Sequence, residues 1–176
     1  MSTQRQPTVV FDTVLMLFDL IDQVEFPSLL ADTGQNINTA NVKVVLGELL
    51  VGADGTLTLP ARETVLVTCA VADDDQSVWP EKGLNTKRET FTTELVVATS
   101  IPNRSARQAY ERCKTLVGTI DATMRDLQTG RPAVPAELTA VGVTSWAVSS
   151  VDTVLYPTGE GFVASAVVGI AVVAHI

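Results

Sequence analysis

One long amphipathic helix, with a strand before it and a strand after it, constrains this chain more than any other feature. Residues 103–130 repeat apolar side chains at spacings of three and four, as a helix with one buried face requires. The repeat consists of Ala106, Ala109, Tyr110, Cys113, Leu116, Val117, Ile120, Met124 and Leu127. The segments 88–100 and 160–176 alternate in the manner of strands instead. This order predicts a helix that lies across a sheet.

The ends and the two faces of the expected helix can also be assigned. Asn103 or Ser105 can cap its start, Ser105 with Gln108 fits a capping box, and Gly130 suits the position after its last turn. The side chains expected against the sheet are Tyr110, Leu116, Val117, Ile120 and Leu127. The charged side chains expected on the solvent face are Arg107, Glu111, Arg112 and Lys114. Gly118 costs the helix about 1 kcal/mol relative to alanine, which indicates close packing or a bend.

A second helix and several short strands complete the expected fold. Apolar residues repeat with helical spacing over residues 8–24, and alternation predicts strands at 42–51, 57–59, 64–72 and 141–156. The expected class is α+β, a single domain over 1–176 with both helices packed on a mostly antiparallel sheet. The strand 160–176 is apolar on both faces, which predicts a central strand or one covered by a neighbouring subunit.

The polar segment 73–87 between the strands 64–72 and 88–100 is much longer than a hairpin turn requires. It mixes Trp79 and Leu84 with charges, as surfaces that order on binding do. We expect a projecting hairpin arm that contacts a partner, although Trp79 could instead pack back onto the domain. The candidate interface residues are Asp73, Asp74, Asp75, Trp79, Glu81, Lys82, Leu84 and Lys87.

The sequence carries no pattern typical of a catalytic or metal site. It has no GxSxG, P-loop or GxGxxG motif. The acidic run at 73–75 lacks the spacing of a calcium loop, and the single histidine, His175, has no spaced partner. Cys69 and Cys113 are expected to be buried free thiols, with a disulfide as the alternative. We therefore expect no enzymatic activity, no cofactor and no metal.

Composition favours a subunit of a larger assembly. Of the 176 residues 46% are hydrophobic and 18% charged, which leaves little polar surface for a monomer. Burial of part of that surface against copies of the chain would relieve this shortage. The net charge of −8 argues against direct binding to a phosphate backbone. No apolar run has the length of a membrane span and no secretory signal is recognisable, so we expect synthesis in the cytosol.

The order and pattern of these elements resemble the tail terminator proteins of long-tailed bacteriophages, also called tail completion or head–tail joining proteins. Family members commonly have a strand of alternating threonine and apolar residues, as at 88–100, before a helix of the pattern A-x-x-R-x-x-x-L-x-x-x-I. Here the pattern falls on Ala109, Arg112, Leu116 and Ile120. A strand like GFVASAVVGIAVVAHI ends many members. The acidic-Leu-Gly-Gly segment that often follows the helix is matched only loosely at 126–130.

The resemblance implies a structural virion protein. Such proteins form a hexameric ring on the last ring of the tail tube, which stops tube polymerisation and offers a docking surface for the head while DNA passes through the centre. The implied partners are copies of the chain, the major tail tube protein and a head-completion or connector protein, without a membrane. The implied location is the tail neck of the virion, after assembly in the host cytoplasm. The alternatives are another phage neck, connector or minor tail subunit, or a small-ligand-binding or enzymatic α+β domain.

Overall fold

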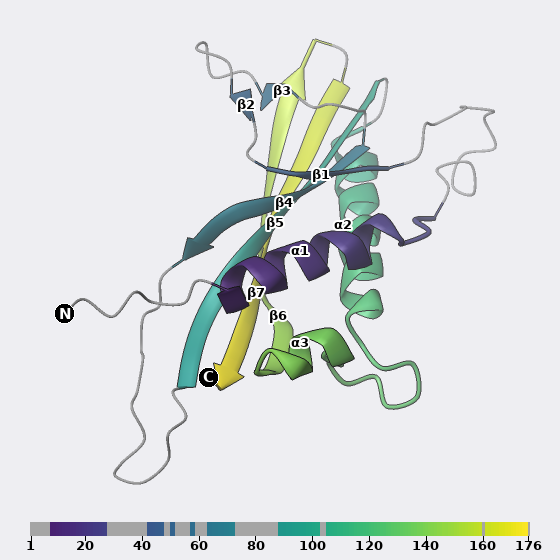
Figure 1. The fold of residues 1–176 in the computed structure, drawn as a ribbon. Helices are drawn as coiled ribbons and strands as arrows, with labels where there is room; N and C mark the ends of the chain where they lie inside the picture. The colour runs from purple at the N-terminus through teal and green to yellow at the C-terminus, as the bar shows by residue number, and fades with distance from the viewer. Residues whose placement is uncertain are drawn as a thin grey trace, which may run out of the picture.

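A computed structural model describes residues 8–27, 42–47, 50–51, 57–58, 63–72, 88–102, 105–159 and 161–175. Within these residues the chain forms three helices and seven strands (Figure 1). The helices are α1 (Thr8–Asp22), α2 (Ala106–Thr123) and α3 (Ala136–Ala140). The strands are β1 (Lys43–Leu46), β2 (Leu50–Val51), β3 (Leu57–Thr58), β4 (Glu63–Ala72), β5 (Arg88–Pro102), β6 (Val143–Thr158) and β7 (Gly161–His175). The expectation of a fold that combines helices with a sheet is confirmed.

Five of the strands form one sheet in the order β1-β4-β5-β7-β6, and β2 pairs with β3 separately. β1 runs parallel to β4, whereas the pairs β4–β5, β5–β7 and β6–β7 are antiparallel. The register of the two longest pairs places Leu95 and Val151 on either side of Val168. The terminal strand β7 is therefore an interior strand, as its apolar character on both faces predicted.

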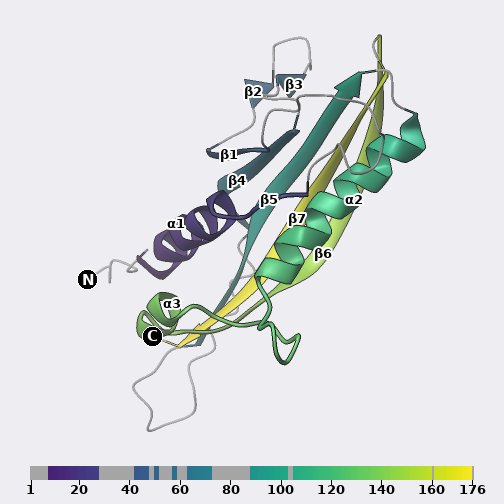
Figure 2. The ribbon, with the colours of Figure 1, turned by 90° about the vertical axis from the view of Figure 1, so that its right-hand side faces the viewer.

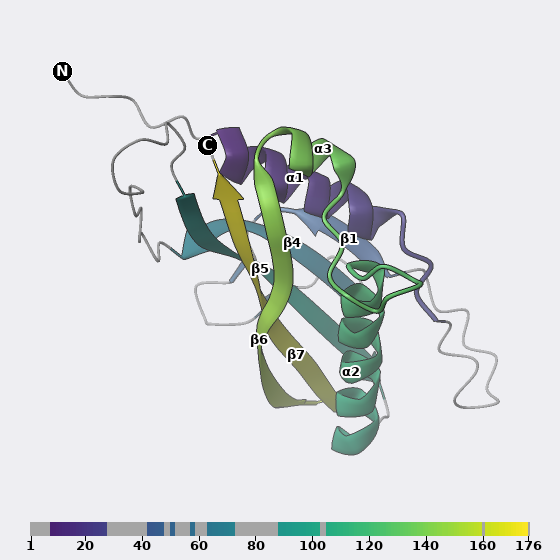
Figure 3. The same ribbon diagram turned by 90° about the horizontal axis from the view of Figure 1, so that it is seen from below.

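Helices α1 and α2 cover the same face of the sheet (Figures 2 and 3). α2 lies against β5 and β7, and α1 lies against β1 and β4. The buried side chains of β7 on that face alternate as the strand period requires, and they are Ala164, Ala166, Val168, Ile170, Val172 and Ala174. Leu17 and Ile21 from α1 and Leu116 and Ile120 from α2 belong to the same core, and all four are fully buried. The buried face assigned to Leu116 and Ile120 is confirmed, and Val117 is half-buried.

The start of α2 agrees with the sequence pattern, but its end does not. The Ser105 side chain accepts a hydrogen bond from the Gln108 backbone N–H, and the Gln108 side chain accepts one from the Ser105 N–H, which completes the capping box. The helix then stops at Thr123, seven residues before Gly130. The prediction that Leu127 is buried is wrong, since its side chain is 99% exposed.

Hydrogen bonds in the following turn explain why α2 ends early. The Asp126 carboxylate accepts hydrogen bonds from the backbone N–H groups of Thr129, at 2.7 Å, and Gln128, at 2.9 Å. These bonds lower the pKa of that carboxyl and favour a turn over a continued helix. Gly130 adopts φ +64°, which glycine tolerates best. Arg125 then pairs with Pro132 in an isolated β-bridge that reverses the chain.

The segment after this turn leads to β6 through α3, a helix of five residues that the apolar pattern did not predict. Leu138 of α3 is buried in the core, as is Trp146 of β6. The Trp146 ring N–H donates a hydrogen bond to the Ala133 carbonyl at 2.7 Å, which satisfies the one polar atom of this buried side chain. The prediction that Trp146 is a core residue is confirmed.

Candidate assembly surface

The outer strand β6 is the most exposed element of the sheet. Among the described residues only β7 pairs with it, so its other edge presents backbone N–H and C=O groups without a strand partner. Residues 149–159 are all exposed, and the large apolar side chains among them are Val151, Val154, Leu155 and Tyr156. Only one residue of β6, Asp152, is charged. Edge strands of soluble monomers usually carry more charge, because an apolar edge invites pairing with another chain.

An open groove of about 410 Å³ separates β6 from α2. It forms because α2 packs mainly on β5 and β7 and leaves Val148 of the outer strand half-buried and Val151 exposed. Val148 and Val151 line it from β6, while Tyr110, Val117 and Gly118 line it from α2. The prediction that Tyr110 is buried is wrong, since this side chain is 45% exposed at the wall of the groove.

Gly118 was predicted to allow close packing or a bend within α2. A methyl group at this position would meet no heavy atom of the described residues within 4 Å, so none of these residues packs closely against it. The expectation of close packing inside the subunit is therefore wrong. Gly118 instead leaves a gap in the side chains along the exposed face of α2, beside the groove.

The charged side chains that line the groove give it a small net positive charge. Lys114 lines it without an ion pair to any described residue, whereas Arg125 pairs with Asp121 through hydrogen bonds of 2.9 and 3.0 Å. Cys113 lies at its base, where burial raises the pKa of the thiol to about 11. Its thiol donates to the Val97 carbonyl at 3.9 Å, and the cysteine is free and buried, as predicted. The side chain of Cys69 lies outside the described residues.

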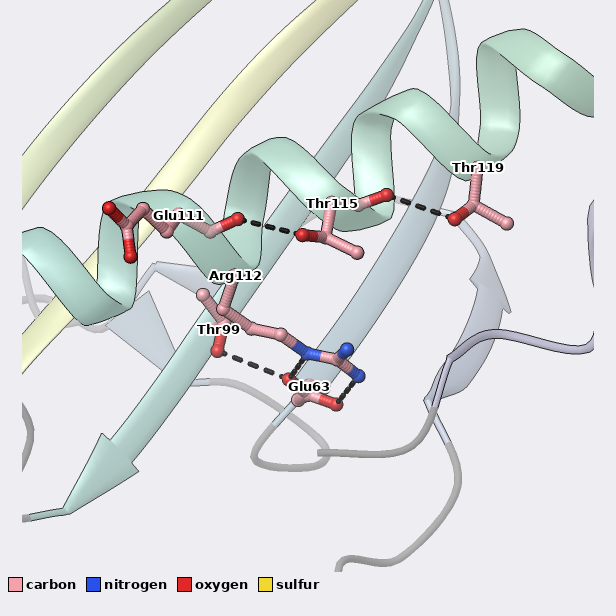
Figure 4. A network of polar contacts seen from close by, with 6 residues as sticks. All are labelled: Glu63, Thr99, Glu111, Arg112, Thr115 and Thr119. Carbon is pink, nitrogen blue, oxygen red and sulfur yellow. Dashed lines mark hydrogen bonds and ion pairs between the residues drawn. The ribbon is translucent and has the colours of Figure 1, made fainter. Parts of the chain in front are cut away.

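A buried ion pair joins α2 to the sheet (Figure 4). The Arg112 guanidinium donates two hydrogen bonds to the Glu63 carboxylate of β4, at 2.6 and 2.8 Å. The Thr99 hydroxyl of β5 donates to the same carboxylate at 3.4 Å. Arg112 and Glu63 are 6% and 4% exposed, so the prediction that Arg112 lies on the solvent face is wrong. Arg107, Glu111 and Lys114 are exposed, as predicted.

The eight candidate interface residues proposed from sequence all lie in the segment 73–87, outside the described residues. His175 is exposed at the end of β7, and its backbone N–H donates to the Gly142 carbonyl at 2.8 Å. Among the residues that the structure describes, no three His, Cys, Asp or Glu side chains gather closely enough to hold a metal ion. No helix in the described part of the chain combines the length and the apolar character that crossing a membrane would require.

No protein-family model matches the sequence, and no curated protein is significantly similar to it.

Proposed function

We propose that this chain is a structural subunit that assembles with copies of itself into a ring, and that the ring terminates the tail tube of a long-tailed bacteriophage and joins the tail to the head. The main support for self-assembly is the exposed, apolar surface of the outer strand β6. Its residues 149–159 are exposed on both faces, they include four large apolar side chains, and only Asp152 is charged. Surface of this kind is typical of a subunit interface.

The assignment to a phage tail is supported by the sequence resemblance. The strand and helix pattern over 88–128 and the apolar final strand carry that resemblance. Charge is also compatible with it, since a chain with a net charge of −8 would form a ring whose lumen does not hold DNA by phosphate contacts. DNA could then pass through the ring without sequence-specific binding.

The segment 73–87 has a place in this proposal as a contact arm. β4 ends at Ala72 and β5 begins at Arg88, and the two strands are adjacent and antiparallel. A turn of two to five residues would suffice to join such strands, so the greater length needs a function. We propose that Trp79 and Leu84 in this segment contact the adjacent subunit or the tube below.

Two other functions remain candidates. Another neck, connector or minor tail subunit would share the exposed edge strand. A small-ligand-binding domain is favoured by the groove, because about 410 Å³ is within the range of small-molecule sites. Solution mass separates the classes, since a ring subunit should reach six times the 18.7 kDa mass of the chain while a ligand-binding domain need not associate.

The decisive experiment is a tube-length assay. A major tail tube protein encoded in the same genome is polymerised with and without the purified chain, and the tubes are measured by negative-stain electron microscopy; a genome that encodes no such protein would itself count against the assignment. A terminator gives tubes that stop growing and carry a ring at one end. Unchanged tube growth, with no ring bound at either end, would exclude the terminator assignment.

A further inference from the structure

We propose that the groove between α2 and β6 receives helix α1 of a second copy of this chain. The proposal rests on the proposed function and names the surface by which the ring would form. The groove is an apolar cleft beside a helix, with Val148 and Val151 on one wall and Tyr110 and Val117 on the other. An amphipathic helix commonly binds such a cleft by inserting apolar side chains spaced one turn apart.

Helix α1 offers side chains with this spacing on its outward face. Phe11 and Leu15 lie four residues apart and are 59% and 50% exposed, although the opposite face of the same helix is buried in the core. Large apolar side chains that stay exposed as a pair on one helix face are typical of a binding ridge. Phe11 and Leu15 are thus the apolar anchors that a groove of this kind would accept.

Gly118 supplies the space that such an anchor needs. It lies on the exposed side of α2 at the groove, and a side chain there would meet no heavy atom of the subunit within 4 Å. A glycine in a helix interior costs about 1 kcal/mol relative to alanine. A helix that docks at Gly118 can approach the α2 backbone closely, which would account for a glycine against which no described part of the subunit packs.

Charge favours the same pairing. The exposed side chains of α1 include Asp12, Asp19 and Asp22, and α1 contains no basic residue. The charged residues that line the groove are Lys114, Asp121 and Arg125, so the groove has a net positive charge on a chain whose net charge is −8. An acidic helix is therefore attracted to the groove, and attraction of this kind also speeds encounter.

The outward face of α1 and the groove lie near opposite edges of the sheet. α1 packs over β1 and β4, whereas the groove borders β6, and these strands begin and end the order β1-β4-β5-β7-β6. One copy can therefore insert its α1 into a neighbour while its own groove accepts a third copy. Contacts of this head-to-tail type close into rings or extend into filaments.

A groove-filling variant tests the proposal without disturbing the core. Gly118→Leu adds a side chain into open space and raises helix propensity, so the subunit should fold at least as stably as wild type by circular dichroism and thermal melting. We expect its self-association, measured by analytical ultracentrifugation over a concentration series, to weaken by about tenfold or more. Thr115→Leu is the matched control, because Thr115 is exposed on α2 but does not line the groove. This control should associate like wild type.

Mixing two variants tests the head-to-tail geometry. Leu15→Asp alters the ridge but leaves the groove intact, and Gly118→Leu does the reverse. At a concentration just sufficient for wild type to associate, each variant alone should be mainly monomeric, and a mixture of the two should form a one-to-one heterodimer and nothing larger. If the mixture stays monomeric, or if Gly118→Leu associates like wild type, the proposed surface is wrong. A wild-type chain that is monomeric at every concentration would also overturn the proposed surface. The tube-length assay tests the proposed function independently of this result.

Discussion

Arg112→Met should destabilise the protein more than any substitution of an exposed charge on the same helix. The change keeps most of the aliphatic stem of the side chain and removes the guanidinium that donates two hydrogen bonds to Glu63. Glu63 is 4% exposed, and among the described residues it would retain the Thr99 hydroxyl, at 3.4 Å, as its one side-chain donor. Loss of one partner from a buried ion pair costs about 3–5 kcal/mol, because the remaining charge stays buried without compensation.

A loss of this size is easily measured by urea denaturation. With an m-value of about 2 kcal/mol/M, a loss of about 4 kcal/mol lowers the urea midpoint by about 2 M. Arg107→Met is the matched control, since Arg107 forms an exposed ion pair with Glu111 at 2.7 Å one turn earlier on α2. Solvent screens exposed pairs, so the control should shift the urea midpoint far less than Arg112→Met does.

The double variant Glu63→Met/Arg112→Met separates the charge from the packing. If the unpaired carboxylate causes the loss, its removal should restore most of the stability, because apolar side chains of similar volume often replace buried ion pairs without cost. If Arg112→Met unfolds at the same urea concentration as Arg107→Met, the ion pair does not hold α2 on the sheet. If the double variant is no more stable than Arg112→Met, the loss does not arise from the unpaired charge.

Three further predictions concern the end of α2, the thiol of Cys113 and the segment 73–87. Leu116→Asp should unfold the domain because Leu116 is fully buried, whereas Leu127→Asp should change the melting temperature little because Leu127 is exposed; equal effects would refute the assigned end of α2. In a Cys69→Ser background, Cys113 should resist a thiol reagent at pH 8 until the protein unfolds, because burial raises its pKa to about 11 and hides the sulfur; rapid native labelling would contradict this. Replacement of 74–86 by Asn-Gly should leave a folded subunit that no longer caps tubes, and normal tube lengths would leave the arm without this role.

Local sequence signals were sufficient for the elements that depend on neighbouring residues. The capping box at Ser105, the apolar spacing of Leu116 and Ile120 and the alternation along β7 each follow from contacts within a few residues or from one buried face. The end of α2 was misplaced because the apolar repeat continues through Leu127. There the turn at Asp126 overrides the repeat, since its side chain satisfies backbone N–H groups that a helix would otherwise use.

The ion pair was missed because its partners are 49 residues apart. Charged residues on helices are usually exposed, so Arg112 was expected on the solvent face despite its position on the helix. The position of Arg112 does indicate burial, since residue 112 lies three residues after Ala109 and four before Leu116, and both of these lie on the buried face. Tyr110 was misassigned in the opposite sense, because the apolar stripe is wider than the face that α2 buries. Its exposed part lines the groove.

The width of the sheet explains why a second copy is the natural occupant of that groove. α1 and α2 together pack mainly on β1, β4, β5 and β7, and α2 and α3 also contact β6, but Val151 and Leu155 of β6 stay exposed. A sheet face is stable when a helix covers it, as this subunit already achieves with its own two helices. The outward face of α1 has the missing apolar anchors and a charge opposite to that of the groove. Docking of α1 from a neighbour would therefore extend across the subunit boundary the packing that α1 and α2 provide within it.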